Sequence, residues 1–313
     1  MRRISAAAAR GREEGAMQYH LIKLISRVIC LLPYRWLLGL GNWLGKLYFW
    51  AAKRQRLRAI EQIRERMELS PAEAEQTIKQ LFLHLGQTVL EVLYMPRLNR
   101  DNIHEYVTLE NRHYLDAAMA EGKGVAILAA HFGNWEWLGA ALALNGYPLA
   151  AVIKPQPNDQ HTRLINEYRS LVGIEVYAKG SNEIIGLIKA FKRGKAVGLI
   201  SDMNAGTTGI TLDFFGKPSS THNGVSIFAA KLGCPVVPAF IVRRPGGGHR
   251  VLLQPPRHFA HSDAPDRDMV EFTAAMSKII EDMIRQYPGQ WLWFHRRWQD
   301  PYAGRSMSGG GGK

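Results

Sequence analysis

The sequence contains no long uninterrupted hydrophobic run. Its most apolar stretch, residues 21–52, is broken by four basic side chains and by Pro33. It therefore does not reach the roughly 18 consecutive apolar residues that a membrane-spanning helix needs. The N-terminus also lacks a small-residue cleavage site of the signal-peptide type. We expect neither a spanning helix nor a cleaved signal peptide.

Cysteine is scarce, and several familiar catalytic motifs are missing. The two cysteines, Cys30 and Cys234, lie far apart in apolar surroundings, which argues against a disulfide framework and favours a reducing compartment. The sequence has no Gly-x-Ser-x-Gly nucleophile elbow, no Walker loop and no His-Glu-x-x-His zinc motif. A covalent acyl-enzyme on Ser or Cys is unsupported, and we expect no cofactor and no metal.

Acidic residues are few relative to basic ones. The chain has 40 Lys and Arg against 27 Asp and Glu, a formal net charge of +13. Such a charge predicts an anionic partner, which is a nucleic acid, an anionic lipid surface or an acidic carrier protein. A nucleic-acid-binding protein would show basic and aromatic residues alternating on a sheet or a recognised motif, and neither is apparent. Nucleic-acid binding remains a distant alternative, and no nucleic-acid partner is expected.

Aromatic and basic residues are interleaved in residues 21–58. Trp36, Trp43 and Trp50 alternate with cations, a pattern that suits the bilayer interface. The basic run 53–58 follows directly, as in segments that are attracted to anionic headgroups. We interpret this region as a surface contact with a membrane, and the alternative is a helical layer buried against the rest of the protein. Three glycines in the same helical pattern predict close packing against another helix: Gly39, Gly41 and Gly45.

Further along the chain, apolar runs alternate with helical patterns. Ser70, Pro71 and Glu73 form a helix start, and we expect three helices over residues 19–94. The alternation predicts an α/β fold with a mainly parallel or mixed central sheet and helices on both faces. The predicted strands are 124–130, 149–153, 174–177, 196–200, 236–242 and 250–253, and the predicted helices that follow residue 94 are 111–121, 135–144, 161–171, 183–192, 221–232 and 267–286. The chain divides into a disordered leader (1–16), an N-terminal helical, membrane-associating region (17–95), an α/β domain (96–302) and a flexible tail (303–313).

The predicted strand 124–130 ends at a histidine. His131 is followed by a Gly-Asn turn and, five residues later, by Glu136. In open α/β sheets ligands bind beyond the carboxyl ends of the strands, where His131 can remove a proton and Glu136 can fix its tautomer. A structural histidine is the alternative. Asp202 follows another predicted strand and is expected at the same edge.

Residues 214–221 are rich in glycine and hydroxyl groups and precede a predicted helix. Free N–H groups at a helix start can bind a phosphate or polarise a carbonyl. Gly216 and Thr221 are therefore predicted to contact substrate, with a helix cap as the alternative for Thr221. Arg169 either binds a phosphate bidentately or forms a surface ion pair. Core packing is predicted for the tryptophans near the C-terminus: Trp291, Trp293 and Trp298.

The string His-Phe-Gly-Asn-Trp-Glu over residues 131–136 resembles the H-x4-D/E motif of glycerolipid and lysophospholipid acyltransferases. The full string is more specific and is similar to that of the bacterial lipid A biosynthesis acyltransferases. Many members of that family carry Asp-Gln where this chain has Asp202-Met203. Further segments in the expected order extend the resemblance over about residues 18–298: Tyr168-Arg169 with Gly173, Phe214-Phe215-Gly216 with Thr221 and Gly224, 235–238, and 287–298.

The resemblance implies transfer of a fatty acyl group from acyl carrier protein or coenzyme A to a hydroxyl of a membrane glycolipid. A lipid A precursor at the cytoplasmic face of the inner membrane is the implied acceptor. The implied partners are the acyl donor, an anionic glycolipid and an anionic membrane surface. Another phosphoglycolipid or a lysophospholipid stays open as acceptor because of Met203, whereas intact His131 and Glu136 argue against a non-catalytic lipid-binding relative. The predicted site comprises His131 and Glu136 as catalytic residues and Asn134, Arg169, Asp202, Gly216 and Thr221 as substrate-binding residues.

Overall fold

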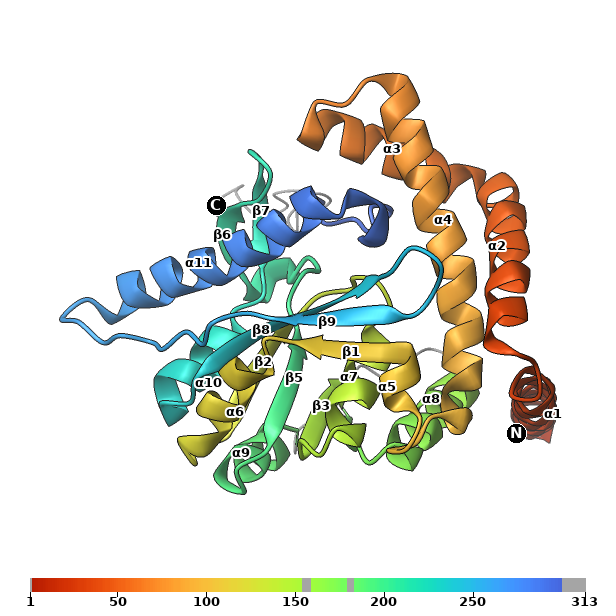
Figure 1. Ribbon diagram of the computed structural model, residues 1–313, viewed down its shortest axis with the longest axis horizontal. Helices are drawn as coiled ribbons and strands as arrows, with labels where there is room; N and C mark the ends of the chain where they lie inside the picture. Colours follow the sequence, from red (N-terminus) through yellow and green to blue (C-terminus); the bar gives the residue numbers. More distant parts are fainter. Residues whose placement is uncertain (1, 154–158, 179–182, 300–313) are drawn as a thin grey trace, which may run out of the picture.

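A computed structural model describes residues 2–153, 159–178 and 183–299 of the chain. A sheet lies in the middle of the molecule with helices packed against it, and long helices from the N-terminal region stand along one side (Figure 1). The predicted tail, residues 303–313, lies outside the described residues.

The central sheet has seven strands in the order β1-β9-β8-β2-β5-β3-β4. Every neighbouring pair is parallel except β8 and β9, which are antiparallel. The predicted α/β fold with a mixed, mostly parallel sheet is confirmed. The strands of this sheet are β1 (Val107–Glu110), β2 (Val125–Ala129), β3 (Leu149–Ile153), β4 (Glu175–Ala178), β5 (Ala196–Ile200), β8 (Val236–Arg243) and β9 (His249–Leu253).

The side chains of β2 alternate between two hydrophobic cores, one on each face of the sheet. Val125 and Ile127 belong to one core, and Ala126 and Leu128 belong to the other, because successive residues of a strand point to opposite faces. All five residues of β2 are buried, which explains why this strand is apolar throughout. Helices must therefore cover both faces of the sheet.

Eleven α-helices occur in the described part of the chain. They are α1 (Arg2–Ile29), α2 (Tyr34–Ala51), α3 (Lys53–Met67), α4 (Pro71–Tyr94), α5 (Ile103–Tyr106), α6 (Arg112–Ala120), α7 (Trp135–Leu144), α8 (Asp159–Leu171), α9 (Glu183–Lys192), α10 (Gly224–Leu232) and α11 (Pro265–Gln286). The α4 start predicted from Ser70 is confirmed, because Ser70 and Glu73 cap each other's backbone N–H groups.

The sequence predicts some elements with the observed bounds and misses others. The bounds of β3, β5, α7 and α9 are those predicted. The N-terminal region differs, because α1 begins at Arg2, inside the expected disordered leader, and residues 19–94 hold parts of four helices instead of three. The sequence does not predict β1, a four-residue strand that is only partly buried, since so short a run carries little periodicity.

The backbones of α2 and α4 approach closely where glycines face each other. A Cβ atom at Gly86 of α4 would overlap backbone atoms of Gly41 and Gly45 of α2, so larger residues would push the helices apart. The predicted role in helix packing is confirmed for Gly41 and Gly45, whereas Gly39 has open space around its Cα. The contact holds α2 on α4, which itself packs against α7 beside the sheet.

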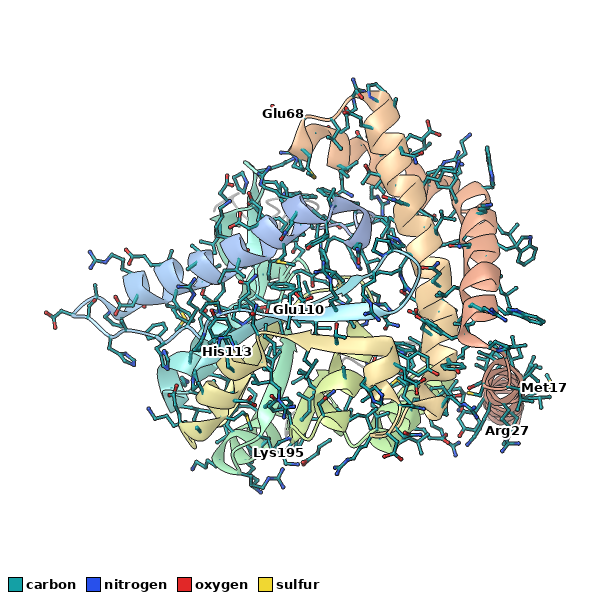
Figure 2. All side chains as sticks on the ribbon, in the orientation of Figure 1. Met17, Arg27, Glu68, Glu110, His113 and Lys195 are labelled. Carbon is teal, nitrogen blue, oxygen red and sulfur yellow. The ribbon has the colours of Figure 1, made fainter. Side chains whose placement is uncertain are left out.

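Helices α1 and α2 each leave an apolar face exposed. Figure 2 labels Met17 and Arg27 on α1, at the edge of the molecule away from the sheet. On α2 the exposed fraction is 63% for Trp36 and 73% for Trp50. The spacing of three or four residues places each set along one side of its helix. The exposed apolar residues that line these two faces are Met17, Leu21, Leu24, Ile25 and Val28 on α1, and Trp36, Leu40, Trp43, Leu47 and Trp50 on α2.

None of the helices in the described ranges combines the length and the hydropathy that crossing a membrane requires.

Candidate active site

The carboxyl ends of β2 and β5 bring His131 and Asp202 together. The two strands are parallel neighbours, with Ala129 opposite Ile200. His131 lies two residues beyond the end of β2, and Asp202 lies two residues beyond the end of β5. Both residues therefore leave the sheet at the same edge, where the sequence places them.

The carboxylate of Asp202 holds the imidazole of His131. Asp202 Oδ1 lies 2.9 Å from His131 Nδ1, and Oδ2 accepts hydrogen bonds from the His131 backbone N–H at 3.0 Å and the Trp291 indole N–H at 2.8 Å. The Asp202 carboxylate is fully buried, while 20% of the His131 side chain is exposed. A carboxylate at Nδ1 favours the tautomer with the proton on that nitrogen, so Nε2 is the ring nitrogen that accepts a proton.

Burial and electrostatics act in opposite directions on the pKa values of this pair. Burial disfavours the imidazolium of His131, but the charge and hydrogen bond of Asp202, assisted by the charge of Glu136, raise its pKa above the usual 6.5. For Asp202, burial opposes ionisation, yet His131 and the Trp291 hydrogen bond lower the pKa to about 2. Asp202 is therefore ionised at neutral pH and stabilises a proton on His131.

Glu136, the predicted partner of His131, is bound by Arg169 instead. Arg169 donates from Nε at 2.8 Å and from Nη2 at 2.6 Å to the two carboxylate oxygens. Both side chains are largely buried, with exposed fractions of 18% for Arg169 and 10% for Glu136. The prediction that Glu136 orients the His131 ring is wrong, because Asp202 makes that contact. The charge of Glu136 helps to raise the pKa of His131. Arg169 forms an ion pair, as in the alternative to phosphate binding, but this pair is largely buried and does not lie at the surface.

Asn134 caps α7 and is completely buried. Its Oδ1 accepts a hydrogen bond from the Trp137 N–H at 3.1 Å, and its Nδ2 donates to Glu91 at 2.9 Å. An Asn in this position satisfies a free N–H group at the helix start. The structure therefore gives Asn134 a structural role and offers no support for the predicted contact with substrate.

Glu91 is the centre of a buried charged cluster beneath the His131 turn. Arg243 donates to its two oxygens at 2.5 and 2.7 Å, Tyr34 donates at 2.7 Å, and His249 Nε2 lies at 3.1 Å. A buried carboxylate is costly unless it is paired and hydrogen-bonded. Burial opposes ionisation here, but His249 and Arg243 hold the pKa of Glu91 far below its usual value. The cluster joins α2, α4, β8 and β9 to Asn134.

Gly133 makes the turn after His131 possible. Its φ is +55°, and a Cβ atom there would overlap the carbonyl oxygen of Ile241 in β8, so a side chain is excluded on both grounds. Its N–H donates to the Gln290 carbonyl at 2.8 Å. The turn is therefore held between β8 and the C-terminal segment 287–298, which is named the closing segment below.

Residues 210–221 form a β-hairpin and do not open a helix. β6 (Ile210–Asp213) pairs antiparallel with β7 (Pro218–Thr221), and α10 begins only at Gly224. The Thr221 hydroxyl is buried and accepts a hydrogen bond from Arg297 at 2.8 Å. Gly216 lies in the hairpin turn with φ +71°. The prediction of a phosphate-binding helix start is corrected, and Gly216 and Thr221 have structural roles in the hairpin.

Three aromatic residues surround the His131–Asp202 pair, and sequence reasoning assigned them no role at the site. The Trp135 and His295 rings lie 5.1 and 5.3 Å from the His131 ring, centroid to centroid. Burial, with the neighbouring His131, lowers the pKa of His295 to about 4, so this ring is neutral at pH 7. Trp291 is buried in the core as predicted and also donates to Asp202. The signal in the sequence that could have pointed to His295 and Trp291 as site residues is their place in the closing segment, because that segment carries part of the family resemblance.

The arrangement is suited to proton transfer. A partly exposed imidazole, with a buried carboxylate behind it, can accept a proton from a hydroxyl and return it to a leaving group. Among the described residues, no group of three or more His, Cys, Asp or Glu side chains is placed to hold a metal ion.

Comparison with known proteins assigns the chain to a family. The sequence profile of the bacterial lipid A biosynthesis acyltransferases matches residues 14–300, so the chain belongs to that family. It is 28% identical to the lipid A biosynthesis palmitoleoyltransferase of Escherichia coli K12 over 284 residues, which is 88% of this chain and 89% of the relative. It is 25% identical to the lipid A biosynthesis lauroyltransferase of the same organism over 283 residues, 87% and 88% of the two chains.

A second kind of relative acts on a different glycolipid. The chain is 24% identical to the phosphatidylinositol mannoside acyltransferase of Mycobacterium tuberculosis CDC 1551 over 220 residues, 68% of this chain and 67% of the relative. The family assignment confirms the resemblance seen in the sequence, and the protein is an acyltransferase. It belongs with lipid A acyltransferases and related glycolipid acyltransferases.

Proposed function

We propose that this acyltransferase transfers a fatty acyl group from an acyl carrier protein or coenzyme A thioester to a hydroxyl of a membrane glycolipid. A phosphorylated lipid A precursor is the proposed acceptor, supported by the family profile and by the two Escherichia coli relatives. His131 is the proposed general base. The observation that carries this role is the buried Asp202 carboxylate 2.9 Å from Nδ1 of a partly exposed imidazole.

The proposed reaction needs one base and no covalent enzyme intermediate. His131 Nε2 accepts the proton of the acceptor hydroxyl while the hydroxyl oxygen forms a bond to the thioester carbonyl carbon. Asp202 and the charge of Glu136 stabilise the imidazolium. When the tetrahedral intermediate collapses, the C–S bond breaks and the imidazolium returns the proton to the leaving thiolate. General-base assistance of this kind contributes about 10²–10⁴-fold to a rate.

The proposed function is tested by a direct transfer assay with the purified protein. We expect an acyl carrier protein thioester and a lipid A precursor to give a product that mass spectrometry finds heavier by one acyl group. Phosphatidylinositol mannoside and a lysophospholipid serve as parallel acceptors, and the mannoside is the second candidate because relatives act on it. Transfer to the lysophospholipid alone, or hydrolysis of the thioester without transfer, would contradict the proposal.

We also propose that the protein binds the cytoplasmic surface of an inner membrane through the exposed faces of α1 and α2. Ten exposed apolar side chains line these faces, and three of those on α2 are tryptophans, which favour the bilayer interface. Exposed cations flank them, namely Arg27, Arg35, Lys46, Lys53 and Arg54. The combination predicts hydrophobic insertion assisted by attraction to anionic headgroups.

Flotation with liposomes tests this surface. Binding should rise with the anionic lipid content and fall with salt, because the Debye length shortens from about 10 Å at 0.1 M to about 3 Å at 1 M. The variant Trp43→Glu/Trp50→Glu should lose most of its binding. Val270→Glu, at an exposed apolar position of α11, is the matched control and should float like the wild type. Equal loss in both variants, or binding indifferent to salt and lipid charge, contradicts the proposal.

A further inference from the structure

A cavity of about 430 Å³ opens beside α3, and neither His131 nor Asp202 lines it. Its walls come from α3, from Lys217 in the β6–β7 hairpin and from the closing segment. In Figure 1, α3 lies above the end of α11, where the closing segment follows. Four of the lining side chains are cations: Arg58, Arg66, Lys217 and Arg296.

The positive charge of this cavity is only partly neutralised. Its walls hold two carboxylates, Glu61 and Glu65, against four cations. Glu65 is paired with Arg66 at 2.7 Å. Within the described ranges, neither Lys217 nor Arg296 has a carboxylate within salt-bridge distance. Lys217 and Arg296 are exposed in the wall of this open cavity, so they can attract an anion and donate charge-assisted hydrogen bonds to it.

The cavity adjoins the candidate active site through the closing segment. Gln62, one of its lining residues, donates from Nε2 to the Trp293 carbonyl at 2.6 Å and to the His295 carbonyl at 3.2 Å. The His295 ring in turn lies 5.3 Å from the His131 ring. Arg296, the next residue, lines the cavity. His295, which lies beside the proposed general base, and Arg296, which lines the cavity, are therefore consecutive residues of the closing segment.

Two of the residues first expected to bind a phosphate are engaged in other contacts. Arg169 is bound to Glu136, and Thr221 is buried against Arg297. We propose that the cavity beside α3 is the subsite that receives a phosphate group of the acceptor glycolipid, an inference that rests on the proposed function. Lys217 and Arg296 supply its free cations.

The position of α3 relative to the exposed faces favours the acceptor as the source of the phosphate. The exposed apolar face of α2 ends at Trp50, and α3 begins at Lys53. With the proposed membrane contact, a glycolipid whose acyl chains remain in the bilayer presents its phosphate at headgroup depth, near the end of α2 from which α3 starts. The cavity volume exceeds that of a single ion and leaves room for the sugar that carries the phosphate.

Steady-state kinetics with matched variants test this subsite. The variant Lys217→Gln/Arg296→Gln should raise the KM for a phosphorylated acceptor at least about tenfold, the effect of losing one or more charge-assisted contacts. Its kcat should stay within about threefold of the wild type, and its KM for the acyl donor should not change. With the dephosphorylated acceptor, wild type and variant should have the same KM.

The control variant removes one arginine and one lysine elsewhere. Arg64→Gln/Lys231→Gln changes exposed cations of α3 and α10 that do not line the cavity, and it should leave the acceptor KM unchanged. An unchanged acceptor KM in Lys217→Gln/Arg296→Gln overturns the assignment, as does an increased KM for the donor, which would place the carrier's phosphate in the cavity. Equal effects in the two double variants would also overturn it.

A binding measurement separates this inference from the proposed function. The His131→Ala protein, which is not expected to turn over, should bind micelles of the phosphorylated acceptor and not those of the dephosphorylated one. Adding Lys217→Gln/Arg296→Gln should abolish that difference. Failure of acyl transfer by the wild type contradicts the proposed function, whereas micelle binding that ignores the phosphate contradicts the subsite.

Discussion

His131→Ala should lower the rate of acyl transfer by about 10²–10⁴-fold, the usual contribution of a positioned general base. The reason is geometric, since the imidazole is the basic group whose Nδ1 is held by Asp202 and whose Nε2 is left to accept the proton. Trp135 and His295 lie beside the ring, but the neutral His295 is too weak a base to substitute at pH 7. The measurement is the single-turnover rate with a radiolabelled acyl donor.

A control must separate lost chemistry from lost structure. In the variant the buried Asp202 carboxylate loses its contact with the ring but still accepts hydrogen bonds from the backbone N–H of residue 131 and from Trp291, so the variant should keep the circular dichroism spectrum of the wild type and melt cooperatively at a lower temperature. His131→Gln, which retains a polar group of similar size, should be as inactive as His131→Ala. A folded His131→Ala protein with more than about a tenth of the wild-type rate would falsify the general-base assignment.

Asp202→Asn should also cost activity, by about 10²–10⁴-fold, and should cost more than Glu136→Gln. The amide preserves the shape of the carboxylate but removes the charge that stabilises the imidazolium and fixes its tautomer. Glu136 contributes to the pKa of His131 through its charge, after the contributions of Asp202, and its oxygens are occupied by Arg169. The measurement is kcat for both variants under identical conditions, and a larger loss in Glu136→Gln would reverse the assignment of the two carboxylates.

The pH profile gives these variants a second readout. The base form of His131 is the active form, so kcat/KM should rise with pH through the pKa of His131, which Asp202 raises above the usual 6.5. In Asp202→Asn that support is lost while burial still disfavours the imidazolium, so the rising limb should move to lower pH. A limb that stays in place in Asp202→Asn would show that a different group titrates.

The sequence predicts well that His131 and Asp202 lie at the carboxyl edge of the sheet, because the ends of apolar strands are local features. The apolar run that ends before His131 is buried on both faces, and its parallel neighbour β5 places Asp202 at the same edge. The α/β alternation and the bounds of β3, β5, α7 and α9 follow from the same periodicity.

The partners of the site residues could not be predicted in the same way. The spacing of five residues suggests a contact between His131 and Glu136, but the first turn of α7 directs Glu136 toward Arg169 of α8. Which carboxylate reaches the ring depends on the packing of separate elements, and this information is not contained in spacing along one segment. The hairpin at 210–221 is a related case, because its strands form a separate two-stranded sheet and its hydroxyl-rich sequence resembles a loop.

The Glu91 cluster has a consequence for how the N-terminal region can be handled experimentally. Tyr34 of α2 and Arg243 of β8 share one buried carboxylate, which also accepts a hydrogen bond from Asn134. Helix α2 and the turn after His131 are therefore parts of one cooperative unit, and α2 is not a detachable element. Truncation before α4 would remove the hydrogen bond that Tyr34 donates to Glu91 and the close packing of α2 on α4. A variant that retains α2 and makes its exposed apolar side chains polar should therefore fold better than a truncated one.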